Sequence, residues 1–227
     1  LQSTTDPVMF FDLASVTKPF TNSLTYFLGP QQFSESMLYC LNHRGGLPAW
    51  GLLPHQGWRE VINSYTIQES ETLYSDYSAL RVMLEFDKIS STGMKKTCQR
   101  IWDKDMMNWL DLPSSAPTPQ YGMRNGIPSY SEVHDPNAYT IKEFCSHAGL
   151  FSTIQGVAQT LLNYQEATDF ILQVQKDLKQ HERRFSFGWD RVVNPSETLA
   201  GKGCHLGTFG HLGFTGTSIW IDPVLSR

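Results

Sequence analysis

The residues with the clearest chemical potential are a serine and a lysine three positions apart, Ser15 and Lys18. On one helical turn, this Ser-x-x-Lys spacing brings the lysine amine beneath the serine hydroxyl. A serine hydroxyl is a weak nucleophile until a nearby base takes its proton, and a lysine can be that base if its pKa is lowered. The pair therefore predicts acyl transfer, although a helix-capping serine beside a solvated lysine would have the same spacing.

Two more groups of polar residues follow in the order that a three-part active site would require. They are Tyr74-Ser-Asp76 and His211-Leu-Gly213. Each group is common by itself, but their order after the serine and lysine strengthens the interpretation of that pair as catalytic.

Seven stretches of the chain share their types and order with one known family. They are Phe11-Asp-Leu-Ala-Ser-Val-Thr-Lys18, His43-Arg-Gly-Gly-Leu-Pro-Ala-Trp50, Leu73-Tyr-Ser-Asp76, Val133-His-Asp-Pro-Asn-Ala138, His147-Ala-Gly-Leu-Phe-Ser-Thr153, Phe187-Gly-Trp-Asp190 and Gly210-His-Leu-Gly-Phe-Thr-Gly-Thr-Ser218. Together, from about residue 11 to residue 223, the sequence resembles the β-lactamase-related serine hydrolases, which include class C β-lactamases, DD-carboxypeptidases and family VIII esterases.

The resemblance implies a role for each matching residue. Ser15 would be the acylated nucleophile, Lys18 its base, and the Tyr74 hydroxyl a proton shuttle toward the leaving group. The backbone N–H groups of Ser15 and Phe214 would form the oxyanion hole, and Gly213 would let the backbone approach the substrate closely. These roles need no metal and no cofactor.

Two positions depart from patterns that are frequent in this family. Asp76 replaces an asparagine, and it could either hold the lysine amine protonated or cap the following helix. His211 replaces a lysine that would be a permanent cation, so strong binding of substrates with a carboxylate is less expected. Together with Tyr74, this histidine favours an esterase-like or peptidase-like branch.

Two alternatives to a serine hydrolase remain open. A penicillin-binding-protein-like binding or regulatory module could keep the fold and lose turnover. Metal-dependent hydrolysis could use His134 and His147, but the spacing of these two matches no common metal motif, and structural hydrogen bonding is the simpler interpretation of both and of Asp135.

Helices must position most of these residues. Apolar spacing predicts helices over residues 16–28, from 33 to the glycines at 45–46, and over 75–89, 94–110, 153–164 and 168–181. Short aromatic and β-branched runs predict antiparallel strands over residues 185–193, 203–210 and 217–222.

The proline-rich segment 111–136 is expected to be an ordered surface excursion. Trp50 and Trp58 lie in a long loop, where core packing is the more usual role of a tryptophan, although both could form a wall of the pocket.

The expected fold is α+β: an antiparallel sheet packed against helices, with a helical lobe over about residues 16–181 and late strands over about 185–222, in one domain spanning residues 1–227. It corresponds to the β-lactamase/transpeptidase-like fold that the resemblance implies. That family usually has two strands before the nucleophile and a strand and helix near the end. We therefore expect a sheet with trimmed terminal strands, whose edges a second chain or another copy could cover.

The composition of the chain limits which binding partners and locations are expected. With a formal charge of −4 and no basic block, the chain is not expected to bind nucleic acid. No apolar run reaches the length of a transmembrane segment, and no signal peptide is evident. The four cysteines form no Cys-x-x-Cys pair and are expected to be free thiols. By resemblance, the substrate is a small molecule or a peptidoglycan-derived peptide, and the location is periplasmic or extracellular.

Overall fold

The computed structural model describes residues 8–225. The chain enters through the short strand β1 (Phe11–Asp12) and continues directly into a helical run. That run has a 3-10 turn (Ala14–Val16), a π-helical segment (Pro19–Ser23) and α1 (Leu24–Leu28). Ser15 therefore lies at the beginning of a helix, as predicted, and that beginning is a tight 3-10 turn.

The remaining helices enclose this first run, with a 3-10 turn at Pro30–Gln32 after α1. They are α2 (Glu35–Leu41), α3 (Trp58–Asn63), α4 (Asp76–Ile89), α5 (Gly93–Gln99), α6 (Pro136–Ile141), α7 (Ile154–Thr168) and α8 (Phe170–Gln180). Side-chain caps fix where four of them begin: Ser34 for α2, Ser75 for α4, Asp135 for α6 and Thr153 for α7.

Two antiparallel sheets and one hairpin complete the fold. The first sheet has the order β1-β5-β2, with β2 (Met106–Asn108) and β5 (Leu150–Ser152). The second has the order β6-β7-β8-β9, with β6 (Phe185–Ser186), β7 (Trp189–Arg191), β8 (Phe209–Leu212) and β9 (Ser218–Ile221). The hairpin joins β3 (Met123–Arg124) to β4 (Ile127–Pro128), and a 3-10 turn (Trp109–Asp111) follows β2.

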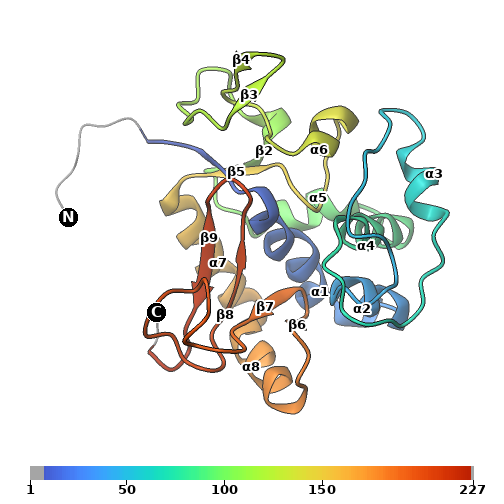
Figure 1. Ribbon diagram of the computed structural model, residues 1–227, viewed down its shortest axis with the longest axis vertical. Helices are drawn as coiled ribbons and strands as arrows, with labels where there is room; N and C mark the ends of the chain where they lie inside the picture. The colour runs from blue at the N-terminus through green and yellow to red at the C-terminus, as the bar shows by residue number, and fades with distance from the viewer. Residues whose placement is uncertain (1–7, 226–227) are drawn as a thin grey trace.

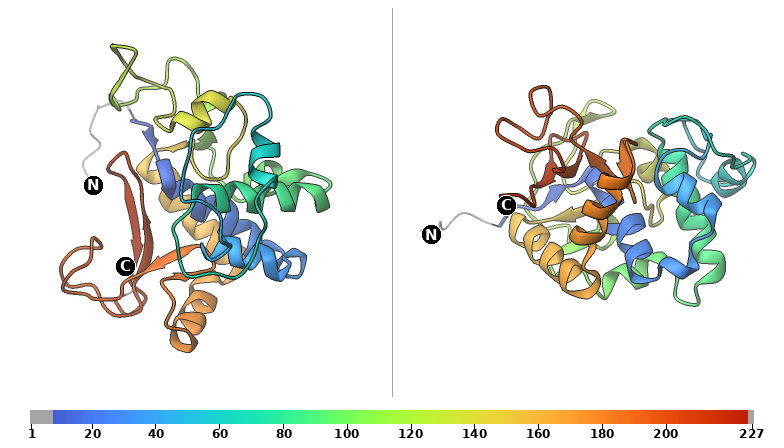
Figure 2. Two further views of the ribbon diagram at one scale, coloured as in Figure 1. Left: turned by 45° about the vertical axis from the view of Figure 1, so that its right-hand side comes forward. Right: turned by 90° about the horizontal axis from the view of Figure 1, so that it is seen from below.

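The first helical run lies between the β8–β9 hairpin and the helices α2 to α4 (Figures 1 and 2). Phe20 and Leu24 in this run are completely buried. On the strand side, the Tyr164 and Phe170 rings stack with centroids 4.1 Å apart, and Phe170 stacks on Trp189 at 5.4 Å. This aromatic packing anchors α7 and α8 against the second sheet, which carries His211.

The predicted α+β arrangement is confirmed, as are the helices that became α4, α7 and α8. The prediction of one helix over residues 94–110 is wrong, because α5 ends at Gln99 and residues 106–108 form β2, which pairs with β5. The strand predicted over residues 185–193 is a hairpin of β6 and β7, because Phe187 and Gly188 adopt positive φ and turn the chain. The strand expected over residues 203–210 begins only at Phe209.

Two further sequence expectations have an outcome here. Within residues 8–225, no helix is both long enough and apolar enough to cross a membrane. All four cysteines are free thiols, as predicted.

Candidate active site

The backbone before Ser15 is strained. Ala14 has φ of +45°, a conformation that residues with a side chain rarely adopt. The Asp12 carboxylate supports it, because Oδ1 accepts the Ala14 N–H at 2.8 Å. The strained turn brings the half-buried Ser15 to the wall of a cavity.

Lys18 lies one helical turn after Ser15, as the spacing predicted. Its Nζ donates to Ser15 Oγ at 2.9 Å and to the backbone oxygen of His147 at 3.0 Å. The same nitrogen lies 2.7 Å from Oδ1 of Asp76, and the Lys18 side chain is only 3% exposed. Two hydrogen-bond acceptors and one carboxylate thus surround the ammonium.

The charge on Lys18 follows from these contacts. Burial lowers the pKa of the Lys18 ammonium, but the Asp76 carboxylate and the neighbouring Tyr74 outweigh burial and raise it above its ordinary value. Ser75, whose Oγ accepts the Ser78 N–H at 2.9 Å, caps α4. Of the two interpretations of Asp76, contact with the lysine is therefore the one that matches the geometry.

Tyr74 lies against both Lys18 and His211. Its ring centroid is 4.9 Å from Lys18 Nζ and 5.8 Å from the centroid of the His211 ring. On another side, the Tyr74 ring packs on the His43 ring with centroids 4.6 Å apart. The buried Nδ1 of His43 accepts the Ser75 N–H. Residues from three distant parts of the chain thus converge beside Ser15.

His211 on β8 is buried and uncharged. Its Nδ1 lies 2.8 Å from the Leu212 carbonyl oxygen, which requires the proton on Nδ1 and leaves Nε2 as the basic nitrogen. Burial and the charge of Lys18 lower the pKa of His211 to about 3. His211 is therefore a neutral group in this site, which agrees with the expectation that it binds a substrate carboxylate less strongly than a lysine would.

The turn after His211 approaches the backbone just before the nucleophile. A Cβ at Gly213 would lie 2.7 Å from the Leu13 backbone oxygen, so a glycine is needed for this close approach. Phe214 follows with its side chain 82% exposed, and its ring lies 5.0 Å from the His134 ring. Phe214 and Ser15, the two residues expected to supply oxyanion donors, border the same cavity.

That cavity has a volume of about 440 Å³ and is bordered by Ser15, Tyr74, Asp76 and Phe214. His211 and Gly213 are not among its lining residues. Trp50 forms part of the wall, whereas Trp58 is 1% exposed and belongs to the core. Trp58 thus has the core role that is more usual for a tryptophan, and Trp50 has the alternative role at the pocket wall.

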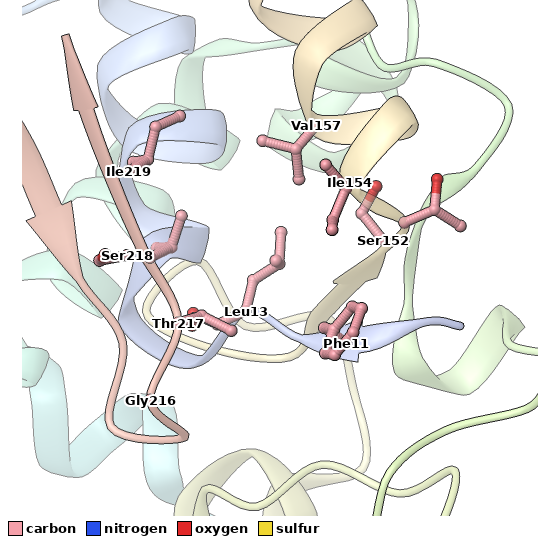
Figure 3. Close-up of a pocket in the computed structure, with 11 residues that line it drawn as sticks. Phe11, Leu13, Ser152, Ile154, Val157, Gly216, Thr217, Ser218 and Ile219 are labelled. Atoms are coloured by element: carbon pink, nitrogen blue, oxygen red, sulfur yellow. The ribbon is translucent and has the colours of Figure 1, made fainter. Parts of the chain in front are cut away.

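A second cavity has a volume of about 300 Å³ and is bordered by other side chains of the segment that leads to Ser15 (Figure 3). Leu13 and Phe11 border it together with Ile154, Val157 and Ile219. Its walls are mainly apolar, and neither Ser15 nor Lys18 borders it. The first cavity, which Ser15 borders, is therefore the candidate active site.

Asp135 and His147 form a buried ion pair, which agrees with the structural hydrogen bonding expected of both, although the sequence did not predict that they contact each other. Oδ1 of Asp135 lies 2.9 Å from His147 Nε2, with side chains 16% and 1% exposed. Burial lowers the pKa of His147, but the Asp135 carboxylate outweighs it and raises this pKa to about 10. Burial raises the pKa of Asp135, but His147 outweighs it and lowers this pKa to about 2. No spacing in the sequence signals that this pair lies beside Lys18.

Ligand atoms of Asp76, Asp135 and His147 lie within 4.8 Å of one another, a distance compatible with a metal ion. Each carboxylate, however, already has a cationic partner, Lys18 for Asp76 and the His147 imidazolium for Asp135. His134 is not part of this group and packs on Phe214 instead. The pairing of His134 with His147 as metal ligands therefore does not match the geometry.

No protein-family model matches the chain. A protein of Salmonella agona, provisionally named as a D-alanyl-D-alanine carboxypeptidase, is 36% identical over 106 residues, which are 42% of this chain and 24% of that protein. The chain thus spans about a quarter of the length of this curated relative.

The solved structures show the fold. A β-lactamase from Mycobacterium bovis aligns with a TM-score of 0.59 and 15% identity over 100% of this chain and 79% of its own. A class C β-lactamase from Rhodobacter sphaeroides aligns with a TM-score of 0.50 and 16% identity over 71% and 56%. The chain has the β-lactamase-like fold that the resemblance predicted, a fold found in serine hydrolases.

Proposed function

We propose that this chain is a serine hydrolase that forms an acyl-enzyme on Ser15 from an ester or amide substrate. The observation that carries the proposal is the contact between Lys18 Nζ and Ser15 Oγ, 2.9 Å long, at the wall of a cavity large enough for a small substrate. The β-lactamase-like fold and the carboxypeptidase name of the relative agree with it.

In the proposed mechanism, Ser15 Oγ attacks the substrate carbonyl while the neutral form of Lys18 takes its proton. The Tyr74 hydroxyl then passes its proton to the leaving group and takes the proton that Lys18 received from Ser15, while the N–H groups of Ser15 and Phe214 stabilise the oxyanion. Water hydrolyses the acyl-enzyme. Because Asp76 holds Lys18 as an ammonium, the reactive form is a minor one whose fraction rises with pH.

The substrate classes that fit are a small ester, a peptidoglycan-type peptide and a β-lactam. The uncharged His211 offers no cation to a substrate carboxylate, which favours the ester. Peptidoglycan-type substrates would place the protein in the periplasm or outside the cell, in line with the carboxypeptidase name of its relative.

One observation favours a second candidate, a binding or regulatory module with weak turnover. The ion pair between Lys18 and Asp76 keeps the base protonated in the resting site. Such a module would bind or acylate without efficient hydrolysis.

Mass spectrometry after incubation with a fluorophosphonate or with penicillin tests the proposal. We expect an adduct on Ser15 and none in Ser15→Ala. No adduct with either reagent would overturn it. Steady hydrolysis of p-nitrophenyl esters that disappears in Ser15→Ala would exclude the binding module, whereas the same slow turnover in both proteins would support it.

A further inference from the structure

Asp12 is a buried carboxylate that the proposed mechanism does not use. It is the last residue of β1, is 0% exposed, and pairs with Phe151 of β5. A carboxylate away from water is costly unless hydrogen bonds satisfy it, so its partners indicate why it is there.

Those partners belong to three separate chain segments, each of which has a residue that borders the candidate active site. Oδ1 accepts the N–H of Ala14, at 2.8 Å, and Oδ2 accepts the N–H of His134, at 2.7 Å. The backbone oxygen of Asp12 accepts the Thr215 hydroxyl, at 2.7 Å. Ala14 precedes the nucleophile, His134 borders the cavity, and Thr215 follows Phe214.

Each of these contacts fixes a segment that has little regular structure of its own. Ala14 is in the strained conformation with φ of +45°. His134 lies just before α6, and Thr215 lies in the turn between β8 and β9. A single residue therefore joins the nucleophile turn, the 111–136 excursion and the hairpin turn.

We infer that Asp12 is a positioning residue, which holds Ser15, His134 and Phe214 in mutual register for acylation. The inference rests on the proposed function, since it concerns the rate at which Ser15 reacts. Misplacing reacting groups by about 1 Å can slow a reaction by about a hundredfold, so loss of one contact has a measurable effect.

The charge of Asp12 matters because only the carboxylate accepts both N–H groups fully. Burial raises its pKa to about 6, although the N–H groups of His134 and Ala14 oppose this shift. Two titratable groups face it: Asp135, which raises its pKa further, and the Tyr121 hydroxyl, which accepts the Asp12 N–H. Below pH 6 one oxygen becomes a hydroxyl, and the hold on Ala14 or His134 weakens.

The experiment compares acylation of wild type and Asp12→Asn by a fluorophosphonate from pH 5 to pH 8, followed by mass spectrometry at Ser15. The ratio of the two rates cancels the pH dependence that Lys18 gives to both proteins. We expect Asp12→Asn to react about tenfold more slowly at pH 7.5, and the ratio to approach one near pH 5. Neither His211 nor His147 changes charge in this range, because their pKa values are about 3 and about 10.

Asp222→Asn is the matched control. Asp222 is 4% exposed and also accepts backbone N–H groups, from Val224 and Leu225, but it borders no part of the candidate cavity. We expect its acylation rate to equal that of wild type. An Asp12→Asn protein that is folded and reacts as fast as wild type at every pH would overturn the inference, as would an equal loss in Asp222→Asn.

Thr215→Val is a milder variant in case Asp12→Asn does not fold. It removes only the hydroxyl that donates to the Asp12 backbone oxygen. We expect acylation slowed by about threefold to tenfold with unchanged circular dichroism, and a wild-type rate would overturn the inference. Failure of the proposed function is a different result, because wild type itself would then carry no adduct on Ser15 at any pH.

Discussion

The ammonium nitrogen of Lys18 lies 2.7 Å from Oδ1 of Asp76, with the two side chains 3% and 15% exposed. Because both side chains are largely buried, the carboxylate strongly favours the charged form of the lysine. The residue expected to act as a base is thus paired with a group that opposes that action. This relationship leads to the first prediction.

Asp76→Asn is expected to speed acylation of Ser15 at neutral pH by about tenfold or more, because removing a close opposite charge lowers a lysine pKa by about 1–3 units. The rise of rate with pH should begin at lower pH than in wild type. Acylation rates from pH 6 to pH 10 measure this shift.

Lys18→Ala is the control for that experiment and should leave almost no acylation in either background. An Asp76→Asn protein that is slower than wild type across the whole range would contradict the prediction. It would show that the carboxylate assists proton transfer.

The pair of Asp135 and His147 is expected to contribute strongly to stability. Asp135→Ala leaves a buried imidazolium without its partner, and loss of one member of a buried pair costs about 3–5 kcal/mol of unfolding free energy. Glu143→Ala is the matched control, because its pair with Arg59 is 44% and 49% exposed and is worth at most about 1 kcal/mol. Urea unfolding at pH 7 measures both, and equal losses would refute the distinction.

The same pair gives stability a pH dependence whose sign can be worked out. The pKa of His147 is raised from 6.5 to about 10, so its contribution is complete below pH 6.5 and is lost as pH rises through 10. The pKa of Asp135 is lowered from 3.8 to about 2, so its contribution is present above pH 3.8 and is lost as pH falls through 2. Wild type should therefore lose stability between pH 7 and pH 10, and Asp135→Ala should lose less.

The sequence predicted those parts of the site that local geometry determines. Ser15 and Lys18 meet because residues three apart share a helix face, which is a property of any helical turn. The position of Tyr74 and His211 beside them came from resemblance to a family, since no local rule joins residues so distant in the chain. The partnership of Asp135 with His147 had neither a local rule nor a known role to signal it.

The missed part of the fold has a similar cause. β2, at Met106–Asn108, contains two methionines, which favour a helix, and an asparagine, which is rare in strands. Its partner β5 lies about forty positions later at Leu150–Ser152. Strands this short carry too few residues for a period of two to be visible. Tertiary pairing, rather than propensity, determines their conformation.

The charge of the substrate gives the fourth prediction. With His211 neutral, an ester whose acyl chain ends in a carboxylate gains no cationic partner from it. We expect p-nitrophenyl butyrate to have a kcat/KM about tenfold above that of mono-p-nitrophenyl succinate, a penalty consistent with one unpaired polar group. Because the pKa of His211 is about 3, this ratio should stay constant from pH 5 to pH 8. A preference for the succinate ester that grows below pH 6.5 would instead indicate a protonated His211.

Gly213 gives the fifth prediction, because it lies where the β8–β9 turn meets the backbone before the nucleophile. A Cβ there would be 2.2 Å from Thr217 Oγ1 and 2.7 Å from the backbone oxygen of Leu13, two residues before Ser15. Gly213→Ala should therefore lower the acylation rate by about tenfold or more and the unfolding free energy by about 1–3 kcal/mol. Gly29→Ala is the control, since the atoms nearest its added Cβ belong to the flexible side chain of Gln32. Full acylation by Gly213→Ala would mean that the turn can move away from Leu13 without disturbing Ser15, and the close approach would then have no part in catalysis.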